Sequence, residues 1–418
     1  MRLQIFSSIA AVCLTGLLAS CGGGSSAESP LNLKAEVGET SVTLSWNSVP
    51  NVEYWLFYAP TIYAPPDNSK MTLWFNLPGG NVQRAVNQPL TITGLIPDVP
   101  YSLTVNGRID GGPGGPAAPT LTVTPRLAGG VWTSGANPVT GSPTMNGMVF
   151  TGAFVAVGGN GKIFASGNAR TWDEVTSPTT THLNGVTYGS VNPGGLIAVG
   201  DSGTLLTSGN GLTWTARTSG TTAKLNSVAV NESTLSVAVG AGGTIITSAD
   251  GVTWAPATSS GTTQDLYEVR FLSNLWFAVG ANGTVVKSVD AKTWTAQTTN
   301  TTASLRSIAY TSLATNSVSA FVVVGAAGKV LTSDNLATAN GTPTWKTVTG
   351  IPATANLNSV VHGAQFVAVG DAGVTFTSTD GLNWKTVTPI TSQNLLAVVR
   401  GPSMYAALGT AGTNLTSK

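Results

Sequence analysis

The stretch from Leu225 to Thr258 contains four short runs in succession: LNSVAV at 225–230, LSVAVG at 235–240, TIITS at 244–248 and VTWAPAT at 252–258. Each run is rich in Val, Ile, Thr or Trp and is bounded by Gly, Asn, Asp or Ser, a pattern typical of β-strands. Gly240–Gly243 and Ala249–Gly251 join successive runs, as expected of tight turns in which glycine supplies a positive φ. The stretch therefore predicts four antiparallel strands.

The same pattern recurs about every 40 residues through the last two thirds of the chain. A Gly-x-x-Gly pair occurs seven times, beginning at positions 158, 200, 240, 280, 325, 370 and 409. A Trp follows a turn seven times, at positions 132, 172, 214, 254, 294, 345 and 384. Four strands in about 40 residues are typical of one propeller blade, which stacks on neighbouring blades to bury its faces.

The two ends of the repeat region are incomplete and complement each other. Gly130–Ser134 carries the first Trp with no glycine pair before it, and Thr413–Lys418 follows the last pair with no Trp run after it. We expect these ends to pair in one blade, because this pairing leaves no open sheet edge. The prediction is an all-β chain in which residues 126–418 form a seven-bladed β-propeller closed by its N- and C-terminal strands.

The turns before the tryptophans share Ser, then Asn or Asp, then Thr or Asn, as in Ser248–Trp254 and Ser378–Trp384. They resemble the Asp-box turns of sialidase-type propellers. With the preceding Gly-x-x-Gly run, residues 129–418 most resemble the photosystem II stability/assembly-factor family and its bacterial relatives, which implies a propeller fold. We expect the Asp or Asn to cap backbone N–H groups of its own turn, and the Trp to pack between blades.

Residues 1–20 are predicted to be a lipoprotein signal peptide. A short basic segment precedes an apolar run from Ile5 to Leu18, which is too short to span a membrane as a mature helix. Leu18–Cys21 resembles a lipoprotein signal-peptidase site, which implies that Cys21 becomes the acylated first residue of the mature protein. An ordinary secretory peptide with an incidental Cys is the alternative. Residues 21–30 would form a flexible Gly/Ser tether.

The lipoprotein resemblance also implies a location and a redox state. Gly rather than Asp follows Cys21, which in Gram-negative bacteria favours the outer membrane, so we expect a lipid-anchored protein of the bacterial cell envelope. Cys13 and Cys21 are the two cysteines of the chain. Cleavage before Cys21 would leave no disulfide, Cys metal ligand or Cys nucleophile.

Residues 31–125 are predicted to be a separate β-sandwich. Val42–Trp46 and Tyr54–Tyr58 alternate as strands, with Trp46 facing a core, and Thr120–Pro125 supplies a last strand. Leu95–Val105 resembles the tyrosine-corner region of fibronectin type III domains. The resemblance implies that Tyr101 hydrogen-bonds to the backbone.

Composition limits the classes of partner. Charged residues make up 9% of the chain and the formal net charge is +1, whereas globular domains average about 25% charged residues. The sequence shows no basic stripe or arginine cluster, so nucleic-acid binding has no electrostatic basis. A surface rich in Thr, Ser, Asn and Gly suits polar, non-ionic contacts.

The sequence offers no catalytic constellation, metal site or cofactor site. His182 and His362 lie in different repeats and outside any metal-binding spacing. A sialidase-like site would need an arginine triad, a Tyr–Glu pair and a further acid, but arginines are few in the repeats, and the glutamates there are Glu174, Glu232 and Glu268. Paired carboxylates for glycoside hydrolysis are not assembled either, so we predict that the protein is not an enzyme.

One candidate binding site follows from the register of the repeats. The second residue of each innermost strand is expected to ring the central mouth: Asn146, Asn184, Asn226, Tyr267, Arg306, Asn358 and Leu396. Such a ring could bind a small polar ligand or a loop of a partner. The alternative is that each Asn bonds to nearby backbone where its strand begins. Long connections at 189–195, 311–318 and 334–343 would carry recognition, or would reflect simple drift.

Two functional hypotheses remain open. The leading one is a non-enzymatic, lipid-anchored scaffold that presents the propeller to an envelope or surface protein, with the sandwich as a spacer. A purely structural envelope or adhesion role is not separable from it by sequence. The assembly-factor resemblance implies such a scaffold, without its photosynthetic target. The alternative is a surface lipoprotein that binds, or less readily cleaves, carbohydrate.

Overall fold

The computed structural model describes residues 26–38, 40–63, 74, 77–78, 80–135, 141, 143–189, 195–231, 235–311, 321–333, 344–402 and 404–418. The chain divides into two compact units, one ending at Leu127 and one spanning Ala128–Lys418. The predicted signal peptide and Cys21 lie outside the described residues. Among the described residues, no helix has the length and apolar character that crossing a membrane requires.

The first unit is a sandwich of two antiparallel sheets. One sheet has the order β1-β2-β5, with β1 Lys34–Gly38, β2 Ser41–Ser45 and β5 Leu90–Ile92. The other has the order β4-β3-β6-β7, with β4 Asn81–Val86, β3 Val52–Pro60, β6 Tyr101–Ile109 and β7 Leu121–Val123.

The sandwich core contains the residues that the alternating pattern predicts. Trp46 is 3% exposed and packs edge-on against Tyr54, with ring centroids 5.5 Å apart. Tyr101 is buried, and its hydroxyl accepts a hydrogen bond from the backbone N–H of Ile96 at 3.3 Å. This bond confirms the backbone role that the sequence predicts for Tyr101.

The second unit is built from four-stranded antiparallel sheets. The first three, from the innermost strand outward, are β9 Met145–Phe150, β10 Phe154–Gly158, β11 Ile163–Ser166 and β12 Asp173–Val175; β13 Leu183–Gly189, β14 Gly195–Gly200, β15 Leu205–Ser208 and β16 Thr215–Arg217; and β17 Leu225–Val230, β18 Ser236–Gly240, β19 Ile245–Ser248 and β20 Ala255–Pro256.

The next three sheets follow the same order: β21 Leu266–Leu272, β22 Leu275–Gly280, β23 Val285–Ser288 and β24 Thr295–Gln297; β25 Leu305–Tyr310, β26 Phe321–Gly325, β27 Val330–Ser333 and β28 Lys346–Thr347; and β29 Leu357–His362, β30 Phe366–Gly370, β31 Thr375–Ser378 and β32 Lys385–Val387. The last sheet joins the two ends of the unit: β33 Leu395–Arg400, β34 Tyr405–Gly409, β35 Asn414–Ser417 and β8 Thr133–Ser134.

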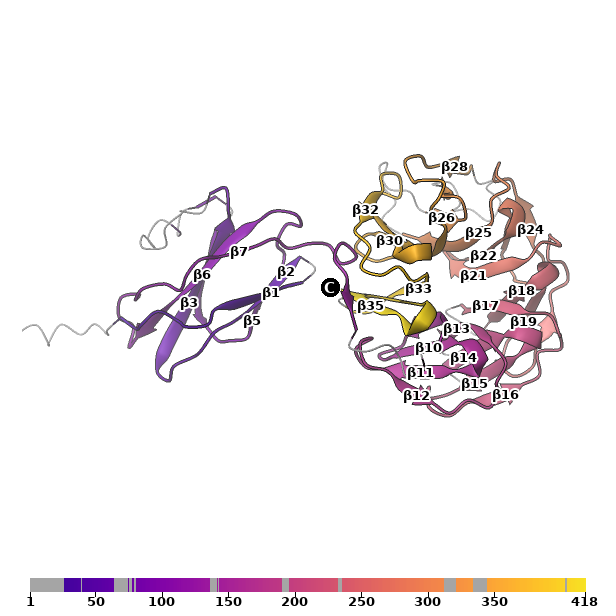
Figure 1. The fold of residues 1–418 in the computed structure, drawn as a ribbon, viewed down its shortest axis with the longest axis horizontal. Helices are drawn as coiled ribbons and strands as arrows, with labels where there is room; N and C mark the ends of the chain where they lie inside the picture. The colour runs from indigo at the N-terminus through magenta and orange to yellow at the C-terminus, as the bar shows by residue number, and fades with distance from the viewer. Residues whose placement is uncertain are drawn as a thin grey trace, which may run out of the picture. The chain divides into compact units, whose positions relative to one another are not determined.

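The sheets are arranged around a common centre, with the innermost strands toward it (Figure 1). Each innermost strand contacts the next one along the chain, and β33 also contacts β9. A shared hydrophobic cluster links the last sheet to the first, because Met145 and Phe154 pack with Ala397 and Leu408. Apolar clusters of this kind between sheets bury the faces that a single sheet would leave exposed.

The two glycines of each Gly-x-x-Gly pair are required for different structural reasons. The first glycine is extended, and a Cβ there would meet backbone: at Gly240 it would lie 1.9 Å from the carbonyl oxygen of Lys224. The second glycine is left-handed as well as crowded: Gly243 has φ +73°, and a Cβ there would lie 2.2 Å from the carbonyl oxygen of Thr262. The pair at Gly240 and Gly243 therefore lets a tight turn pass close to two neighbouring segments.

The turns before the tryptophans are stabilised by their own side chains. Asp250 Oδ1 accepts hydrogen bonds from the N–H groups of Val252 and Thr253 at 2.8 and 2.7 Å. Those backbone bonds, that of Thr253 first, hold the pKa of the Asp250 carboxyl well below its usual range. Trp254 Nε1 donates to the carbonyl oxygen of Gly251 at 3.2 Å. The expected capping role of the acidic residue is confirmed at this turn.

The indole of Trp254 packs between two sheets. It shares a hydrophobic cluster with Ile197 and Leu205 of the preceding sheet and with Leu225 and Ile246 of its own. Trp214 lies in the same way between the first two sheets. These contacts confirm the packing role predicted for the repeated Trp.

Candidate functional site

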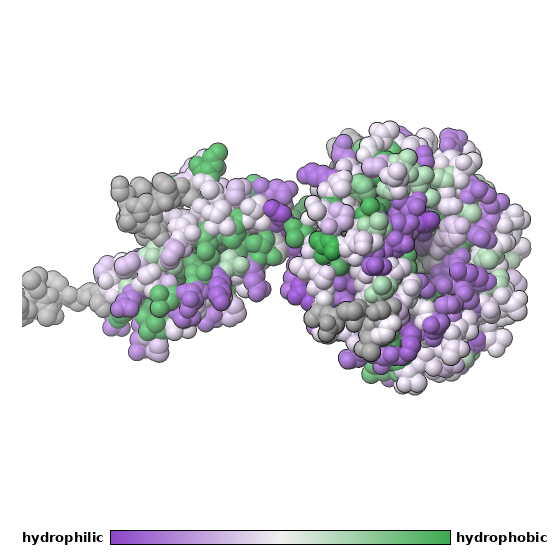
Figure 2. Space-filling view, viewed as in Figure 1, coloured by the Kyte–Doolittle hydropathy of each residue, from purple (hydrophilic) through white to green (hydrophobic). Residues whose placement is uncertain are grey.

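The structure brings the predicted ring residues together at one central cavity. The second residues of the innermost strands all line a cavity of about 350 Å³: Asn146, Asn184, Asn226, Tyr267, Arg306, Asn358 and Leu396. In the space-filling view, hydrophilic residues gather around the centre of this face of the second unit (Figure 2).

A β-bulge places each of these side chains. In β17 the register shifts between Leu225 and Ser227, so Asn226 has no partner residue in β18. The same shift occurs at the start of the other innermost strands. A bulge re-aims a side chain relative to a regular strand, and here it repeats in every sheet of the second unit.

The four ring asparagines connect neighbouring sheets through their amide nitrogens. Each Nδ2 donates to the carbonyl oxygen of the first residue of the next innermost strand: Asn146 to Leu183 at 2.8 Å, Asn184 to Leu225 at 2.9 Å, Asn226 to Leu266 at 2.8 Å and Asn358 to Leu395 at 2.8 Å. The alternative expectation of bonds to backbone is therefore met, but the acceptor belongs to the next sheet. The Oδ1 atoms of Asn146, Asn184 and Asn226 accept no hydrogen bond from the described residues.

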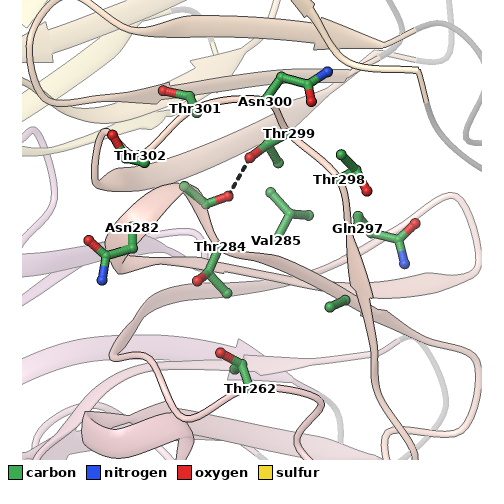
Figure 3. A pocket seen from close by; sticks show the side chains of 12 residues that line it. Thr262, Asn282, Thr284, Val285, Gln297, Thr298, Thr299, Asn300, Thr301 and Thr302 are labelled. Atoms are coloured by element: carbon green, nitrogen blue, oxygen red, sulfur yellow. Dashed lines mark hydrogen bonds between the residues drawn. The ribbon is translucent and has the colours of Figure 1, made fainter.

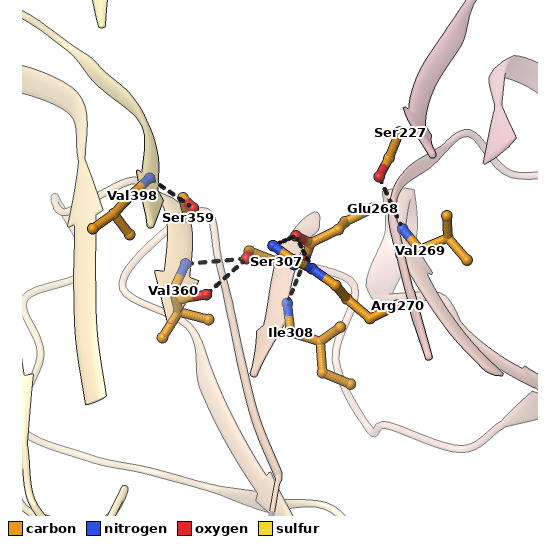
Figure 4. Close-up of polar contacts among 9 residues, drawn as sticks. All are labelled: Ser227, Glu268, Val269, Arg270, Ser307, Ile308, Ser359, Val360 and Val398. Atoms are coloured by element: carbon orange, nitrogen blue, oxygen red, sulfur yellow. Dashed lines mark hydrogen bonds and ion pairs between the residues drawn. The ribbon is translucent and has the colours of Figure 1, made fainter. Parts of the chain in front are cut away.

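A second row of bonds between sheets lies one residue further along the innermost strands (Figure 4). The hydroxyl oxygens of Ser227, Ser307 and Ser359 accept hydrogen bonds from the N–H groups of Val269, Val360 and Val398, at 3.3, 3.0 and 3.2 Å. These serines were not among the residues predicted from the sequence. The signal was present, since Ser recurs at the third position of three innermost strands.

Glu268 takes the place of Ser in this row. Its Oε2 accepts a hydrogen bond from the N–H of Ile308 at 2.6 Å, and its Oε1 pairs with Arg270 at 2.9 Å (Figure 4). The Glu268 side chain is 13% exposed. Both carboxylate oxygens are therefore already bonded within the protein.

The charges that line the cavity are unbalanced. Its lining contains Arg270, Arg306 and Arg400 but a single acidic residue, Glu268, so arginines outnumber carboxylates in the lining by two. Arg306 is half-buried and donates to Asn358 Oδ1, a neutral acceptor. Within the part of the chain that the structure describes, no carboxylate forms an ion pair with Arg306. This grouping corrects the expectation that arginines do not cluster, because the three lie far apart in the sequence.

The opposite wall of the cavity is uncharged. The residues that β9, β13 and β17 contribute to the lining include the three asparagines, Gly147, Gly185 and several aliphatic side chains, but no ionisable group. The cavity therefore presents amide oxygens on one side and guanidinium groups on the other.

A second concavity, a groove, lies beside the start of β23 and the end of β24 (Figure 3). It has a volume of about 720 Å³ and is lined mainly by hydroxyl and amide side chains, with no charged residue: Thr262, Asn282, Thr284, Gln297, Thr298, Thr299, Asn300, Thr301 and Thr302. Thr299 Oγ1 donates to the carbonyl oxygen of Gly283 at 2.6 Å, while Asn282 Nδ2 donates to Gln264 Oε1 at 2.6 Å. This groove is not among the sites predicted from the sequence.

The histidines have structural environments. His182 Nδ1 accepts a hydrogen bond from the N–H of Asn160 at 3.1 Å. His362 packs on Phe366 with ring centroids 4.4 Å apart, and burial together with the charge of Arg400 lowers the pKa of its imidazole. Neither histidine lines the central cavity. Among the described residues, no group of three His, Cys, Asp or Glu side chains could hold a metal ion.

Other predicted features cannot be placed in this geometry. Cys21 lies outside the described residues. So do residues 190–194, 312–318 and 334–343, which make up most of the three long connections.

Comparison with known proteins covers both units. Residues 28–123 match the fibronectin type III domain family, close to the predicted limits of 31–125. A comparison with curated protein sequences finds no match.

Solved structures resemble the second unit. YCF48 from Cyanidioschyzon merolae is 15% identical with a TM-score of 0.55, and the match covers 68% of this chain and 98% of that one. YCF48 bound to a D1 peptide is 16% identical with a TM-score of 0.55, covering 68% and 94%. Virginiamycin B lyase from Staphylococcus aureus is 10% identical with a TM-score of 0.58, covering 69% and 98%. At these identities the likeness shows a shared propeller-like fold.

Proposed function

We propose that the protein is a non-enzymatic binding scaffold whose central cavity receives a carboxylate-bearing segment of a protein partner. The second unit, Ala128–Lys418, would be a seven-bladed propeller of the Asp-box type, closed by its two terminal strands. The order of the four-stranded sheets and the pairing of β8 with β35 support this architecture.

The observation that carries the proposal is the half-buried Arg306, which has no acidic partner among the described residues. Withdrawing a guanidinium from water is costly unless a counter-charge compensates it. Glu268 cannot serve, because Arg270 and the N–H of Ile308 already occupy its oxygens. A ligand carboxylate would supply the missing charge, and a cleft with low-dielectric walls strengthens that attraction.

The uncharged wall of the cavity, which carries Asn146, Asn184 and Asn226, offers hydrogen-bond acceptors that suit a peptide. Main-chain N–H groups are donors that need acceptors once they leave water, and three ring asparagines offer Oδ1 atoms with no donor from the described residues. Their Nδ2 atoms are fixed by the bonds to the next sheet, so these oxygens are held in place. That a similar structure, YCF48, was solved with a bound D1 peptide supports a protein ligand for this fold.

We further propose that Cys21 is acylated and anchors the protein in the bacterial envelope, in the outer membrane. The support is the lipoprotein-type sequence Leu18–Cys21 and the Gly that follows it. The fibronectin type III domain would then be the spacer between the lipid and the binding cavity.

Photo-crosslinking from inside the cavity tests the proposed ligand. A photoreactive amino acid replaces Leu396, and crosslinked peptides are identified by mass spectrometry after irradiation of intact envelopes. We expect a partner segment that carries an acidic side chain or a free C terminus, and loss of the crosslink with Arg306→Gln. Arg217→Gln is the control, since Arg217 lies on the outermost strand β16 and bonds to Thr207 Oγ1. Equal crosslinking by both variants would refute the proposal.

A neutral glycan is the second candidate ligand, at the groove of Figure 3. Its hydroxyl and amide lining carries no charge, which suits the hydroxyl groups of an uncharged sugar. A glycan array with the purified protein and with Gln297→Ala tests this candidate. Binding of neutral glycans that weakens in Gln297→Ala and persists in Arg306→Gln would place sugar recognition in the groove, and an array without signal would remove it.

A further inference from the structure

Two arginines and a tryptophan form a stacked group on the first unit. Trp55 lies on β3, and its neighbours Tyr54 and Leu56 belong to the sandwich core, so the indole lies on the opposite face of the sheet. Arg108 of β6 lies over the Trp55 ring with its Cζ 3.6 Å from the centroid, and Arg84 of β4 lies at 4.6 Å. These strands flank β3 on its two sides.

The positive charge of this group is only partly balanced. None of the ion pairs formed by the described residues involves Arg84 or Arg108. The acidic side chain in contact with the group is Glu53, which accepts a hydrogen bond from Trp55 Nε1. Arg84 and Glu53 are exposed, whereas Trp55 and Arg108 are half-buried. Arg108 Nη1 donates to the carbonyl oxygen of Gly112 at 3.3 Å, which is a neutral acceptor and leaves the guanidinium charge unbalanced. An anion beside the indole ring would therefore meet the exposed Arg84 directly and the part of Arg108 that this bond leaves free.

The segment Ser26–Ser29 is fixed against the sandwich, which corrects the expectation that residues 21–30 form a flexible tether throughout. Ser26 forms an isolated antiparallel bridge with Arg108, and Ala27 is 5% exposed. A Cβ at Gly115 would lie 1.8 Å from the carbonyl oxygen of Ala27, so this glycine is needed for the close approach. Ser29 Oγ donates to the carbonyl oxygen of Ala117 at 3.0 Å. The chain N-terminal to Ser26 therefore starts beside Arg108.

The length of that chain limits how far the stacked group can lie from a lipid anchor. Five peptide units separate Cys21 from Ser26, and a fully extended chain spans at most about 3.6 Å per residue, or about 18 Å in total. If Cys21 carries the acyl chains, Arg108 cannot leave the immediate neighbourhood of the lipid headgroups. This step rests on the anchor proposed above.

We propose that the face formed by Trp55, Arg84 and Arg108 docks on the anionic phospholipid headgroups of the membrane that holds the protein. Guanidinium groups bind phosphate oxygens in a bidentate manner, and Trp is enriched at the membrane–water interface. Two arginines attract a free protein weakly. Tethering raises their effective concentration at the surface, so that weak contacts suffice to orient the domain.

The test supplies the tether chemically. In residues 21–418 Cys21 is the single cysteine, so it can be coupled to a maleimide lipid in vesicles of phosphatidylcholine with or without phosphatidylglycerol. Phenylglyoxal modification of each arginine is then followed by mass spectrometry. We expect Arg84 and Arg108 to react several-fold more slowly on the anionic vesicles, while Arg217 of the second unit is unchanged. Equal rates for Arg84 and Arg108 on both kinds of vesicle would overturn the proposal.

Flotation of the uncoupled protein with phosphatidylglycerol vesicles at low salt gives an independent measurement. Arg84→Gln combined with Arg108→Gln should lower the bound fraction several-fold, whereas Arg217→Gln should not. Equal flotation of the two variants would also count against the docking face. Neither experiment depends on acylation in the cell, which the mass of the native N-terminal peptide tests separately. A failed anchor and a failed docking face are therefore distinguishable.

Discussion

Replacing Asn226 by Ala and by Asp separates the two roles of the ring asparagines. Asn226 Nδ2 donates to the carbonyl oxygen of Leu266 at 2.8 Å. Asn226→Ala removes one neutral hydrogen bond, worth about 1 kcal/mol of unfolding free energy. Asn226→Asp keeps the shape but sets a carboxylate against that carbonyl, so the acceptor is unsatisfied and repelled, at a cost of about 2 kcal/mol.

Thermal unfolding measures the difference. For a unit of this size, about 1 kcal/mol corresponds to about 2–4 °C in Tm, so we expect Asn226→Asp to lower Tm by about 4–8 °C and Asn226→Ala by about half as much. Asn300→Asp is the matched control, because Asn300 is exposed and its side chain forms no hydrogen bond with another described residue.

The pH dependence gives a sharper criterion. The protonated form of the introduced carboxyl group can donate to the Leu266 carbonyl, so the folded-state pKa of this group is raised above its unfolded value of about 3.9. The penalty of Asn226→Asp should therefore be full at neutral pH and should shrink as pH falls through the raised pKa. If Asn226→Ala and Asn226→Asp were both as stable as the wild type at neutral pH, the claim that the hydrogen bond from Asn226 Nδ2 joins the two sheets would be refuted.

Three further predictions concern the repeats. Gly240→Ala should lower the unfolding free energy by about 3 kcal/mol in urea titrations, because the added Cβ would lie 1.9 Å from the carbonyl oxygen of Lys224. Gly242→Ala is the control and should cost about 1 kcal/mol, because Gly242 has open space around it. Similar losses in the two variants would contradict the claim that crowding requires Gly240. Because the pKa of Asp250 is lowered, its contribution to the unfolding free energy is complete above the unfolded pKa of about 3.9 and disappears as pH falls through the folded value. Asp250→Asn should therefore reduce the loss of stability at acid pH, measured by urea unfolding. An unchanged loss at acid pH would refute this role of Asp250. Burial lowers the pKa of His362, so the unfolding free energy should fall as pH drops below about 6.5. His362→Phe should reduce this dependence of stability on pH in the same titrations. An unchanged dependence would assign the effect to other groups.

The sequence was sufficient to predict the elements and the position of the ring. Short runs bounded by Gly-x-x-Gly and by the capped turns repeat with one register, so residues at equivalent positions meet at one place. Asn146 and Asn358, about 200 residues apart, line the same cavity for that reason. The fibronectin-type core, with Trp46 and Tyr101, follows equally directly from strand alternation.

The bonds between sheets could not be predicted from one repeat alone. The bulge at Asn226 depends on how β17 and β18 pair, and its acceptor Leu266 belongs to the next repeat. The charge of the cavity could not be predicted from the sequence either, because Glu268 pairs with Arg270 whereas Arg306 has no comparable partner among the described residues. Such compensation depends on three-dimensional neighbours that spacing does not encode.

The donor of each asparagine bond sits at the second position of one repeat, and its acceptor sits at the first position of the following repeat. Copying one of the four units of about 40 residues that carry this Asn would therefore bring a donor and an acceptor together, so the inserted unit could bond to the unit that follows it and accept a bond from a preceding unit that has the Asn. Insertion of a segment shorter or longer than a whole period would break this spacing, which makes the intact unit the natural step by which this array gains or loses material over evolutionary time.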